Sequence, residues 1–265
     1  MADAPKRKAL PLSECGVLIT GGTSGVGLAT AIQFAEAGVT RIGVNGRNRE
    51  RGEAARQAIL ARVPGARVEF FAGDCNDAAE ARQVCETARE KLGSVDVLVN
   101  STVGPYGPKL FHKIPLDDIP KIVAGQMLAP LLTSSLVVPW MRERGGGAII
   151  NIASDAGKVA TPGETVIGAA MAGIIMFTRG LAIEGKRDGI RANVLTPSII
   201  EGTATYDKVM SDEFSGKLFG KAIKMAQLGV VEADDLAALI VFLAGPQAAK
   251  LTGQAISVNG GISVA

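Results

Sequence analysis

The sequence predicts a single α/β domain over residues 1–265, in which helices cover both faces of a doubly wound parallel sheet of about seven strands. Short apolar runs of strand length alternate with helical stretches along the whole chain. These runs are almost continuously apolar, as expected of strands that are buried on both faces. The length lies at the upper edge of one domain, and no linker or internal repeat divides the chain.

The first half of the chain is expected to contain four strand–helix units. The runs "GVLIT", "RIGVN", "RVEFF" and "VDVLVN" are apolar enough for buried strands, and each precedes a stretch of helical pattern. A loop rich in Gly and Pro separates the fourth strand from its helix. The expected strands and helices are, in order, 16–20 and 25–37, 41–45 and 49–62, 67–71 and 78–92, and 95–100 and 117–142.

The second half is expected to complete the sheet. The runs "GAIINIAS", "IRANVLT" and "GQAISVN" predict strands over 147–154, 190–196 and 253–259. Helices are expected near 164–185 and 233–244, and the segment 198–218 reads as irregular.

Composition narrows the function classes. A net charge of +2 gives no argument for nucleic-acid or membrane binding. The three cysteines have no metal-ligand spacing, so no metal is expected, and their odd number favours a reducing, cytoplasmic compartment. The start MADAPKRKALPL lacks the apolar run of a signal peptide. The longest uncharged apolar run, 165–178, is too short to span a bilayer and predicts a buried helix.

A glycine-rich turn joins the first strand to the first helix in "VLITGGTSGVGLATAIQFAEAG". Such a turn lets backbone N–H groups approach a pyrophosphate at the positive end of a helix. Gly27 would also let the helix pack close to the sheet. A turn with a purely structural role would use the same glycines, so the pattern alone leaves both interpretations open.

The spacing Thr20-Gly21-x-x-x-Gly25-x-Gly27 resembles the cofactor loop of the short-chain dehydrogenase/reductase family, whose members have a Rossmann-type fold. The resemblance covers nearly the whole chain. "GDCND" is similar to the segment that touches adenine, "DVLVN" to the start of the Asn-Asn-Ala-Gly motif, and "IRANVLTPSIIEGT" to the segment that closes over the nicotinamide. Here Ser198 replaces a glycine, and Asn259 stands where Asp is usual. The cofactor-binding residues expected from these motifs and from the second strand are Gly21, Thr23, Ser24, Gly25, Val26, Gly27, Arg47, Asp74, Cys75, Asn100, Pro197 and Ile200.

The end of the second strand bears on which nucleotide binds. An acidic residue there would accept the 2′-hydroxyl of NAD(H), but the chain reads Val44-Asn45-Gly46-Arg47-Asn48. The guanidinium of Arg47 suits a 2′-phosphate. We therefore expect NADP(H) rather than NAD(H), although Arg47 could also belong to a solvated helix start.

The family's catalytic residues are mostly replaced. "VVPWMRERGGGAIINIAS" resembles the region that ends in the catalytic serine, here Ser154. Counting thirteen and then four residues onward, as in the family, gives Ile167 and Met171 where the resemblance implies tyrosine and lysine. The family's asparagine corresponds to Gln126. Neither Ile nor Met can move a proton or hold the nicotinamide ribose.

Other residues could carry chemistry. Glu164 lies three before the lost tyrosine and is a candidate acid or base, or a partner of the helix dipole. Tyr106 borders the expected pocket as a proton donor or as lining. Ser154 could hydrogen-bond a carbonyl oxygen or simply satisfy backbone. Asp155 and Lys158 are expected to face solvent. His112 is expected at the surface, and Tyr206 to lie in the irregular segment.

Three functions remain open. The first is an oxidoreductase acting on a small, largely uncharged carbonyl-type substrate with altered chemistry, since the sequence offers no evident basic pocket residues. The second is a non-redox lyase, isomerase or hydrolase on the same scaffold, and the third a silent nucleotide-binding or partner subunit. The helices near 117–142 and 164–185 are apolar on more than one face, which predicts a homotetramer or homodimer.

Overall fold

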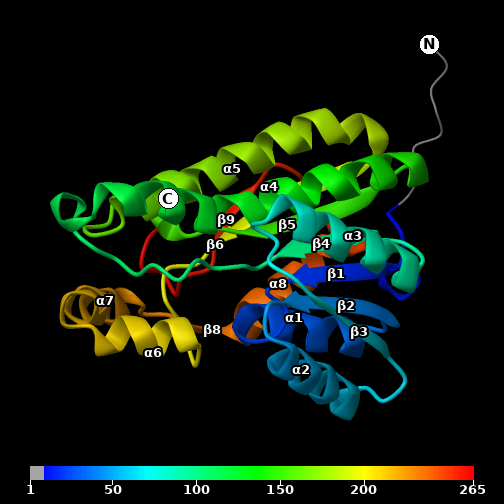
Figure 1. Ribbon diagram of the computed structural model, residues 1–265, viewed down its shortest axis with the longest axis horizontal. Helices are drawn as coiled ribbons and strands as arrows, with labels where there is room; N and C mark the ends of the chain where they lie inside the picture. Colours follow the sequence, from blue (N-terminus) through cyan, green and yellow to red (C-terminus); the bar gives the residue numbers. More distant parts are fainter. Residues whose placement is uncertain (1–8) are drawn as a thin grey trace.

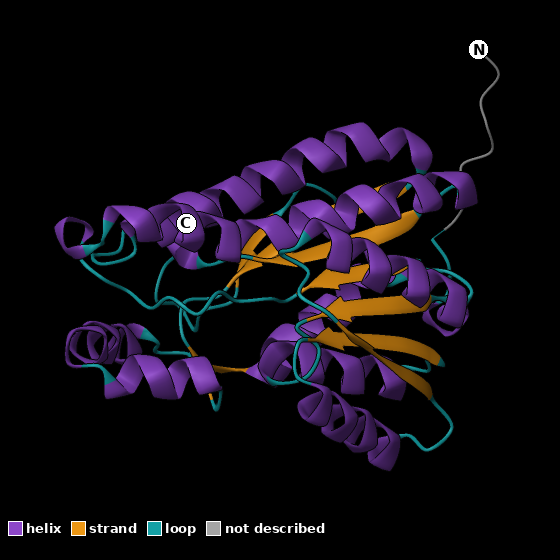
Figure 2. Cartoon of the chain, in the orientation of Figure 1, coloured by secondary structure: helices purple, strands orange, loops and turns teal. Residues whose placement is uncertain are grey.

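The computed structural model describes residues 9–265, and its main sheet is parallel and covered by helices on both faces (Figures 1 and 2). The strand order is β3-β2-β1-β4-β5-β6-β9, and all six pairings are parallel. The strands of this sheet are β1 (Gly16–Thr20), β2 (Arg41–Gly46), β3 (Arg67–Ala72), β4 (Val97–Asn100), β5 (Gly147–Ile152), β6 (Ile190–Thr196) and β9 (Ala255–Ser257). This confirms the predicted seven-stranded, doubly wound Rossmann-type sheet.

Helices cover both faces of the sheet (Figure 1). Side chains alternate across each strand, so Val17 and Ile19 join the core on one face while Leu18 joins the core on the other. On the first face lie α1 (Gly25–Glu36), α2 (Arg49–Arg62) and α8 (Ala233–Ala244). On the second face lie α3 (Ala78–Leu92), α4 (Ile119–Arg144) and α5 (Thr165–Gly185).

The chain reverses its direction across the sheet between β1 and β4, which are neighbours although β2 and β3 lie between them in sequence. Thr20 and Asn100 end these two strands and are register partners. In sheets of this kind ligands bind beyond the carboxyl ends of the strands at this reversal. The fold therefore places the glycine turn and the segments after β4 and β5 at one edge.

The segment 198–218 is not irregular, contrary to the sequence-based expectation. It contains α6 (Ala204–Ser211) and the start of α7 (Glu213–Met225), together with β7 (Ile200–Glu201), which pairs with β8 (Val231–Glu232) in a separate two-stranded sheet. Side-chain caps begin both helices, since Thr203 Oγ1 accepts from the Tyr206 amide and Asp212 Oδ1 from the Ser215 amide. The strand expected over 253–259 is also shorter than predicted.

The stretches Leu116–Arg144 and Thr165–Asp188 are long and apolar enough to cross a membrane by length and composition alone. Both pack within the fold, however, since α4 contacts α3 and α5, and α5 packs on β6. We therefore describe α4 and α5 as core helices of the domain.

Candidate functional site

The glycine turn after β1 has backbone conformations that require glycine. Gly21 and Gly25 have φ values of 64° and 50°. A Cβ on Gly27 would lie 2.3 Å from the Gly21 carbonyl oxygen, so a side chain there would collide with the turn. The Gly22 amide donates to the Asn45 carbonyl at 2.9 Å, which ties the turn to the end of β2.

The first turn of α1 is open to an anionic ligand. Ser24 is its N-cap residue, and within the described chain its side chain makes no capping hydrogen bond, so the free amides of the helix start keep their donors. Thr203, just before α6, lies 3.5 Å from the position of a Gly25 Cβ. The cradle thus has the backbone donors and the helix dipole that a pyrophosphate needs, and the residues fit a dinucleotide here.

Arg47 and Asp74 meet beyond the ends of β2 and β3. Arg47 Nη1 lies 3.5 Å from Asp74 Oδ2, and the Arg47 side chain is 65% exposed. The Asp74 carboxylate also accepts from the Asn76 amide at 2.9 Å. An exposed guanidinium can turn to a 2′-phosphate, but the Asp74 carboxylate competes for it. Beside them, burial raises the pKa of the Cys75 thiol, which favours the neutral thiol.

Asn100 has a structural role rather than a free side chain. Its Oδ1 accepts from Thr133 Oγ1 at 2.8 Å and from Thr20 Oγ1 at 3.2 Å, and its Nδ2 donates to Asn151 Oδ1 at 2.9 Å. Asn151 continues the chain by donating to Thr178 Oγ1 at 2.9 Å. All five side chains are buried, so this network joins β1, β4, β5, α4 and α5 beneath the site.

Ser154 follows β5 on a loop that is braced from below. Its Oγ accepts a hydrogen bond from the Ala156 amide at 3.2 Å, so the hydroxyl proton can still be donated. The next side chain, Asp155, is buried at 6% exposure, contrary to the expected solvent-facing position. Its carboxylate accepts from Asn259 Nδ2 at 2.8 Å, Ser257 Oγ at 3.3 Å and Ser263 Oγ. The segment 257–263 thereby holds the loop that carries Ser154.

Lys158 is also drawn into this brace and does not face solvent as expected. Its Nζ donates to Ser257 Oγ at 2.8 Å and to the carbonyl oxygens of Ala255 and Ala265 at 3.0 Å and 2.8 Å. Burial lowers its pKa, while the nearby Asp155 opposes that change. A lysine with its three donors engaged below the loop is not a substitute for the lost lysine on α5.

Ile167 and Met171 belong to an apolar cluster on α5 and are 9% and 7% exposed. The Tyr106 ring packs against the same cluster from the loop after β4. Gln126 is buried, and its Oε1 accepts from the Gly104 amide at 3.2 Å, so its amide group braces that loop. The positions that carry the family's tyrosine, lysine and asparagine are thus filled by packing and bracing groups.

Glu164 is the titratable side chain next to this cluster. It is half-buried at the N-cap position of α5, and its carboxylate makes no hydrogen bond to the described residues. Burial raises its pKa from 4.5 to about 7. A carboxyl with such a pKa is protonated in part at neutral pH and can act as acid or base.

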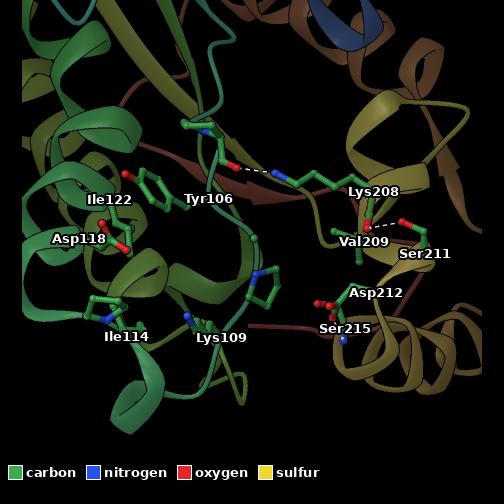
Figure 3. Close-up of a pocket in the computed structure, with 14 residues that line it drawn as sticks. Tyr106, Lys109, Ile114, Asp118, Ile122, Lys208, Val209, Ser211, Asp212 and Ser215 are labelled. Carbon is green, nitrogen blue, oxygen red and sulfur yellow. Dashed lines mark hydrogen bonds between the residues drawn. The ribbon is translucent and has the colours of Figure 1, made fainter.

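A cavity of about 480 Å³ opens between the loop after β4 and α6–α7 (Figure 3). Tyr106, Lys109 and Ile122 line one side, and Lys208 and Asp212 line the other. The cavity therefore contains two lysines, and the expectation of no basic residues near the pocket is wrong. Ser154 and Glu164 are outside its lining, although Gly163 touches its wall through a 2.7 Å bond from the Lys109 amide.

The remaining predicted residues lie at the same edge. Thr23 lies against Gly46 at the end of β2, and Val26 is buried in the first turn of α1. The Pro197 carbonyl accepts from the Asp155 amide at 2.8 Å, and Ile200 begins β7. His112 is exposed as expected, whereas Tyr206 lies on α6.

Sequence reasoning missed the partners of Asp155 and the two lysines of the cavity. The one signal in the sequence that pointed to the partners of Asp155 was Asn259, which stands where the family usually has Asp. No signal pointed to the two lysines, because Lys109 and Lys208 lie about a hundred positions apart in the sequence and line one cavity only in the fold.

With this geometry described, comparison places the chain among known proteins. Residues 16–213 match the family of short chain dehydrogenases. The protein therefore belongs to the short-chain dehydrogenase/reductase family, as the motifs predicted.

Individual relatives extend the match over almost the whole chain. An uncharacterized oxidoreductase of Thermotoga maritima is 32% identical over 249 residues, which cover 92% of this chain and 96% of the relative. A 7α-hydroxysteroid dehydrogenase in complex with NADH and 7-oxo glycochenodeoxycholic acid is 28% identical, with a TM-score of 0.86 and 96% coverage of both chains. An NADPH-bound short chain oxidoreductase from Pseudomonas aeruginosa PAO1 with an atypical catalytic center is 27% identical, with a TM-score of 0.86 over 96% of this chain and 99% of that one. These names support the prediction that the protein is an enzyme of the oxidoreductase class.

Proposed function

We propose that the protein is an NADP(H)-dependent oxidoreductase of small carbonyl-type compounds whose reacting end is largely uncharged, with a proton donor other than the family's tyrosine. The observation that carries this proposal is the pairing of an open cofactor cradle with an apolar α5. The glycine turn and the free start of α1 retain the features that hold a pyrophosphate. Ile167 and Met171 meanwhile line the usual catalytic face with hydrocarbon and a thioether.

The cofactor would be held by backbone amides of the glycine turn, with Arg47 at the 2′-phosphate. When bound, reduced nicotinamide supplies the hydride for a carbonyl carbon. Preference for NADP(H) is supported by the exposed Arg47 and by the absence of a carboxylate at the end of β2. The NADPH complex of the relative with an atypical catalytic center is consistent with this preference.

Two residues of this chain act on the substrate oxygen, one as a hydrogen-bond donor and the other as an acid or base. Ser154 donates its hydroxyl hydrogen to that oxygen, while its Oγ still accepts the hydrogen bond from the Ala156 amide. Glu164 supplies or accepts the proton, because burial raises its pKa to about 7, so the carboxyl can do both near neutral pH. Tyr106 packs against the apolar cluster beside the proposed reacting end.

A titration with NADPH, followed by a panel of carbonyl compounds, tests the proposal. We expect tight binding and a loss of reduced-nicotinamide absorbance with some carbonyls, abolished in Ser154→Ala and strongly reduced in Glu164→Gln. Glu184→Gln, an exposed carboxamide on the same helix, is the matched control. Substrate turnover without an absorbance change would replace the proposal with a non-redox reaction, and nucleotide binding without turnover would favour a silent subunit.

A further inference from the structure

The cavity between the loop after β4 and α6–α7 has charges on opposite walls (Figure 3). Lys109 comes from the loop, and Lys208 comes from α6. Asp118 precedes α4, and Asp212 stands between α6 and α7. The formal charges of these four groups cancel, but the two carboxylates and the two lysines differ in whether neighbouring residues already pair with their charge.

Both carboxylates have partners within the protein. Asp118 Oδ1 lies 3.4 Å from Lys121 Nζ. Asp212 Oδ1 accepts from the Ser215 amide at 2.8 Å at the N-cap of α7, a position where a carboxylate balances the positive helix end. The hydrogen bonds from Ser215 hold the pKa of Asp212 below its usual value, so it is ionised and engaged.

Neither lysine has a carboxylate partner among residues 9–265. Lys208 Nζ donates to the Pro105 carbonyl oxygen, a neutral acceptor that leaves its positive charge unbalanced. No hydrogen bond or ion pair of the Lys109 ammonium is formed with the described residues. Two positive charges therefore face one cavity from two elements, and Ile114, Ile122 and Val209 add apolar lining to the same cavity.

The cavity adjoins the proposed reacting end of the site. The Lys109 amide donates to the Gly163 carbonyl at 2.7 Å, which holds the lysine's backbone beside Glu164 at the start of α5. Tyr106 lines the cavity and also packs against the cluster that contains Ile167 and Met171. A ligand could thus extend from the apolar face of α5 into the space between the two lysines.

We propose that Lys109 and Lys208 bind an anionic end of the substrate, so that the substrate is a carbonyl compound with a carboxylate or phosphate remote from its reacting carbonyl. The identity of the reacting end rests on the proposed function, whereas the anion site rests on the cavity alone. The uncharged character expected from the sequence then applies to the reacting end only.

Equilibrium binding to the full chain, with and without saturating NADPH, tests the anion site without any need for turnover. Matched ligand pairs separate the two anion sources. For a carboxylate, levulinate is compared with levulinamide, and longer oxo acids are compared with their amides. For phosphates, acetoacetyl-coenzyme A is compared with the neutral acetoacetyl N-acetylcysteamine thioester. We expect the anionic member of at least one pair to bind about tenfold tighter or better, as charge-assisted hydrogen bonds allow.

Variants assign that preference to the two lysines. Lys109→Met and Lys208→Met should each remove most of it, and the arginine variants should retain it. Lys250→Met, at an exposed position outside the cavity, should leave it unchanged. Equal affinities within every pair, no binding of any pair, or a preference that survives the double methionine variant would overturn the proposal. An anion preference without carbonyl reduction would instead retain the anion site and refute the redox function.

Discussion

The side-chain amide of Asn259 donates a 2.8 Å hydrogen bond to the buried carboxylate of Asp155. In the family that the sequence resembles, Asp is usual at the position of Asn259, whereas this chain has an amide there and a buried carboxylate at Asp155 on the serine loop. Asp155→Asn should destabilise the fold by about 1–3 kcal/mol, since it replaces a charge that satisfies three side-chain donors. Asn259→Asp should cost at least as much, because it sets two carboxylates side by side.

Chemical denaturation of both single variants and of the double exchange gives the coupling between the two sites. We expect the double exchange to be less destabilised than the sum of the single variants, because it again pairs one carboxylate with one amide. Strict additivity would show that the pair does not act as a unit.

The stability of the protein should depend on pH through Glu164. Its pKa is about 7 in the fold against 4.5 for the free side chain, so between these values the folded state holds more protons than the unfolded state. The stabilising contribution is therefore complete below about pH 4.5 and is lost as the pH rises through about 7, by at most about 3 kcal/mol. Glu164→Gln should flatten this slope and be more stable than wild type above pH 7.

Thermal unfolding across this pH range measures the effect, with Glu184→Gln as the exposed control. A slope in Glu164→Gln equal to that of wild type would place the pH dependence on another group.

Arg47 should decide the choice between the two nucleotides. Arg47→Ala should reduce the affinity for NADPH by about 10- to 100-fold and leave NADH nearly unchanged, since only the first carries a 2′-phosphate. Asp74→Asn should strengthen NADPH binding modestly, because Asp74 lies 3.5 Å from the guanidinium and competes for it. Calorimetry with both nucleotides checks this, and Arg49→Ala serves as control. A preference that survives Arg47→Ala would mean that another group reads the phosphate.

Simple ketones and aldehydes should be reduced slowly by the wild-type protein, because Ser154 has no tyrosine and lysine behind it. Ile167→Tyr with Met171→Lys should create weak reductase activity, and either change alone should do much less. A lone lysine would be a costly charge among the apolar neighbours of Met171, and a lone tyrosine would keep its ordinary pKa. Assays of NADPH oxidation with the wild type, the two single variants and the double variant measure this difference. Brisk wild-type reduction that Ser154→Ala leaves unaffected would refute the assignment.

The exposed apolar side chains of α4 and α5 predict a homotetramer, or at least a dimer. Val123 and Leu128 on α4 are each 37% exposed, and Met176 and Ile183 on α5 are 63% and 64% exposed. Met176→Glu with Ile183→Glu should lower the mass found by light scattering without unfolding the domain. A monomeric wild-type protein at micromolar concentration would exclude this assembly.

The sheet could be predicted from sequence because its strands are buried on both faces and its helices are long. The runs at 16–20 and 190–196 have the same bounds in the structure, as do the helices at 49–62 and 78–92. Of the two helices after β7, α7 has an apolar face that the period of its sequence shows, whereas α6 could not be predicted, because it is short and buries none of its residues. Its start depends on the Thr203 cap.

Within the site, the motif residues could be placed from sequence, but their neighbours could not. Asp155 reads as a loop carboxylate, and its burial depends on partners about a hundred residues later. Arg47 was identified, yet its contact with Asp74 depends on the register of β2 and β3. Long-range pairings of this kind leave no local pattern in a single sequence.

The hydrogen bonds from Thr20 through Asn100 and Asn151 to Thr178 have a consequence for how this enzyme could diverge. Apolar contacts tolerate small slippage between neighbouring strands, whereas directional bonds between fixed side chains do not. The ends of β1, β4 and β5 are therefore held in alignment by residues other than the ones that carry out the reaction. Replacement of the tyrosine and the lysine on α5 thus leaves this hydrogen-bond network intact, and the same rigid strand ends can support a different reaction.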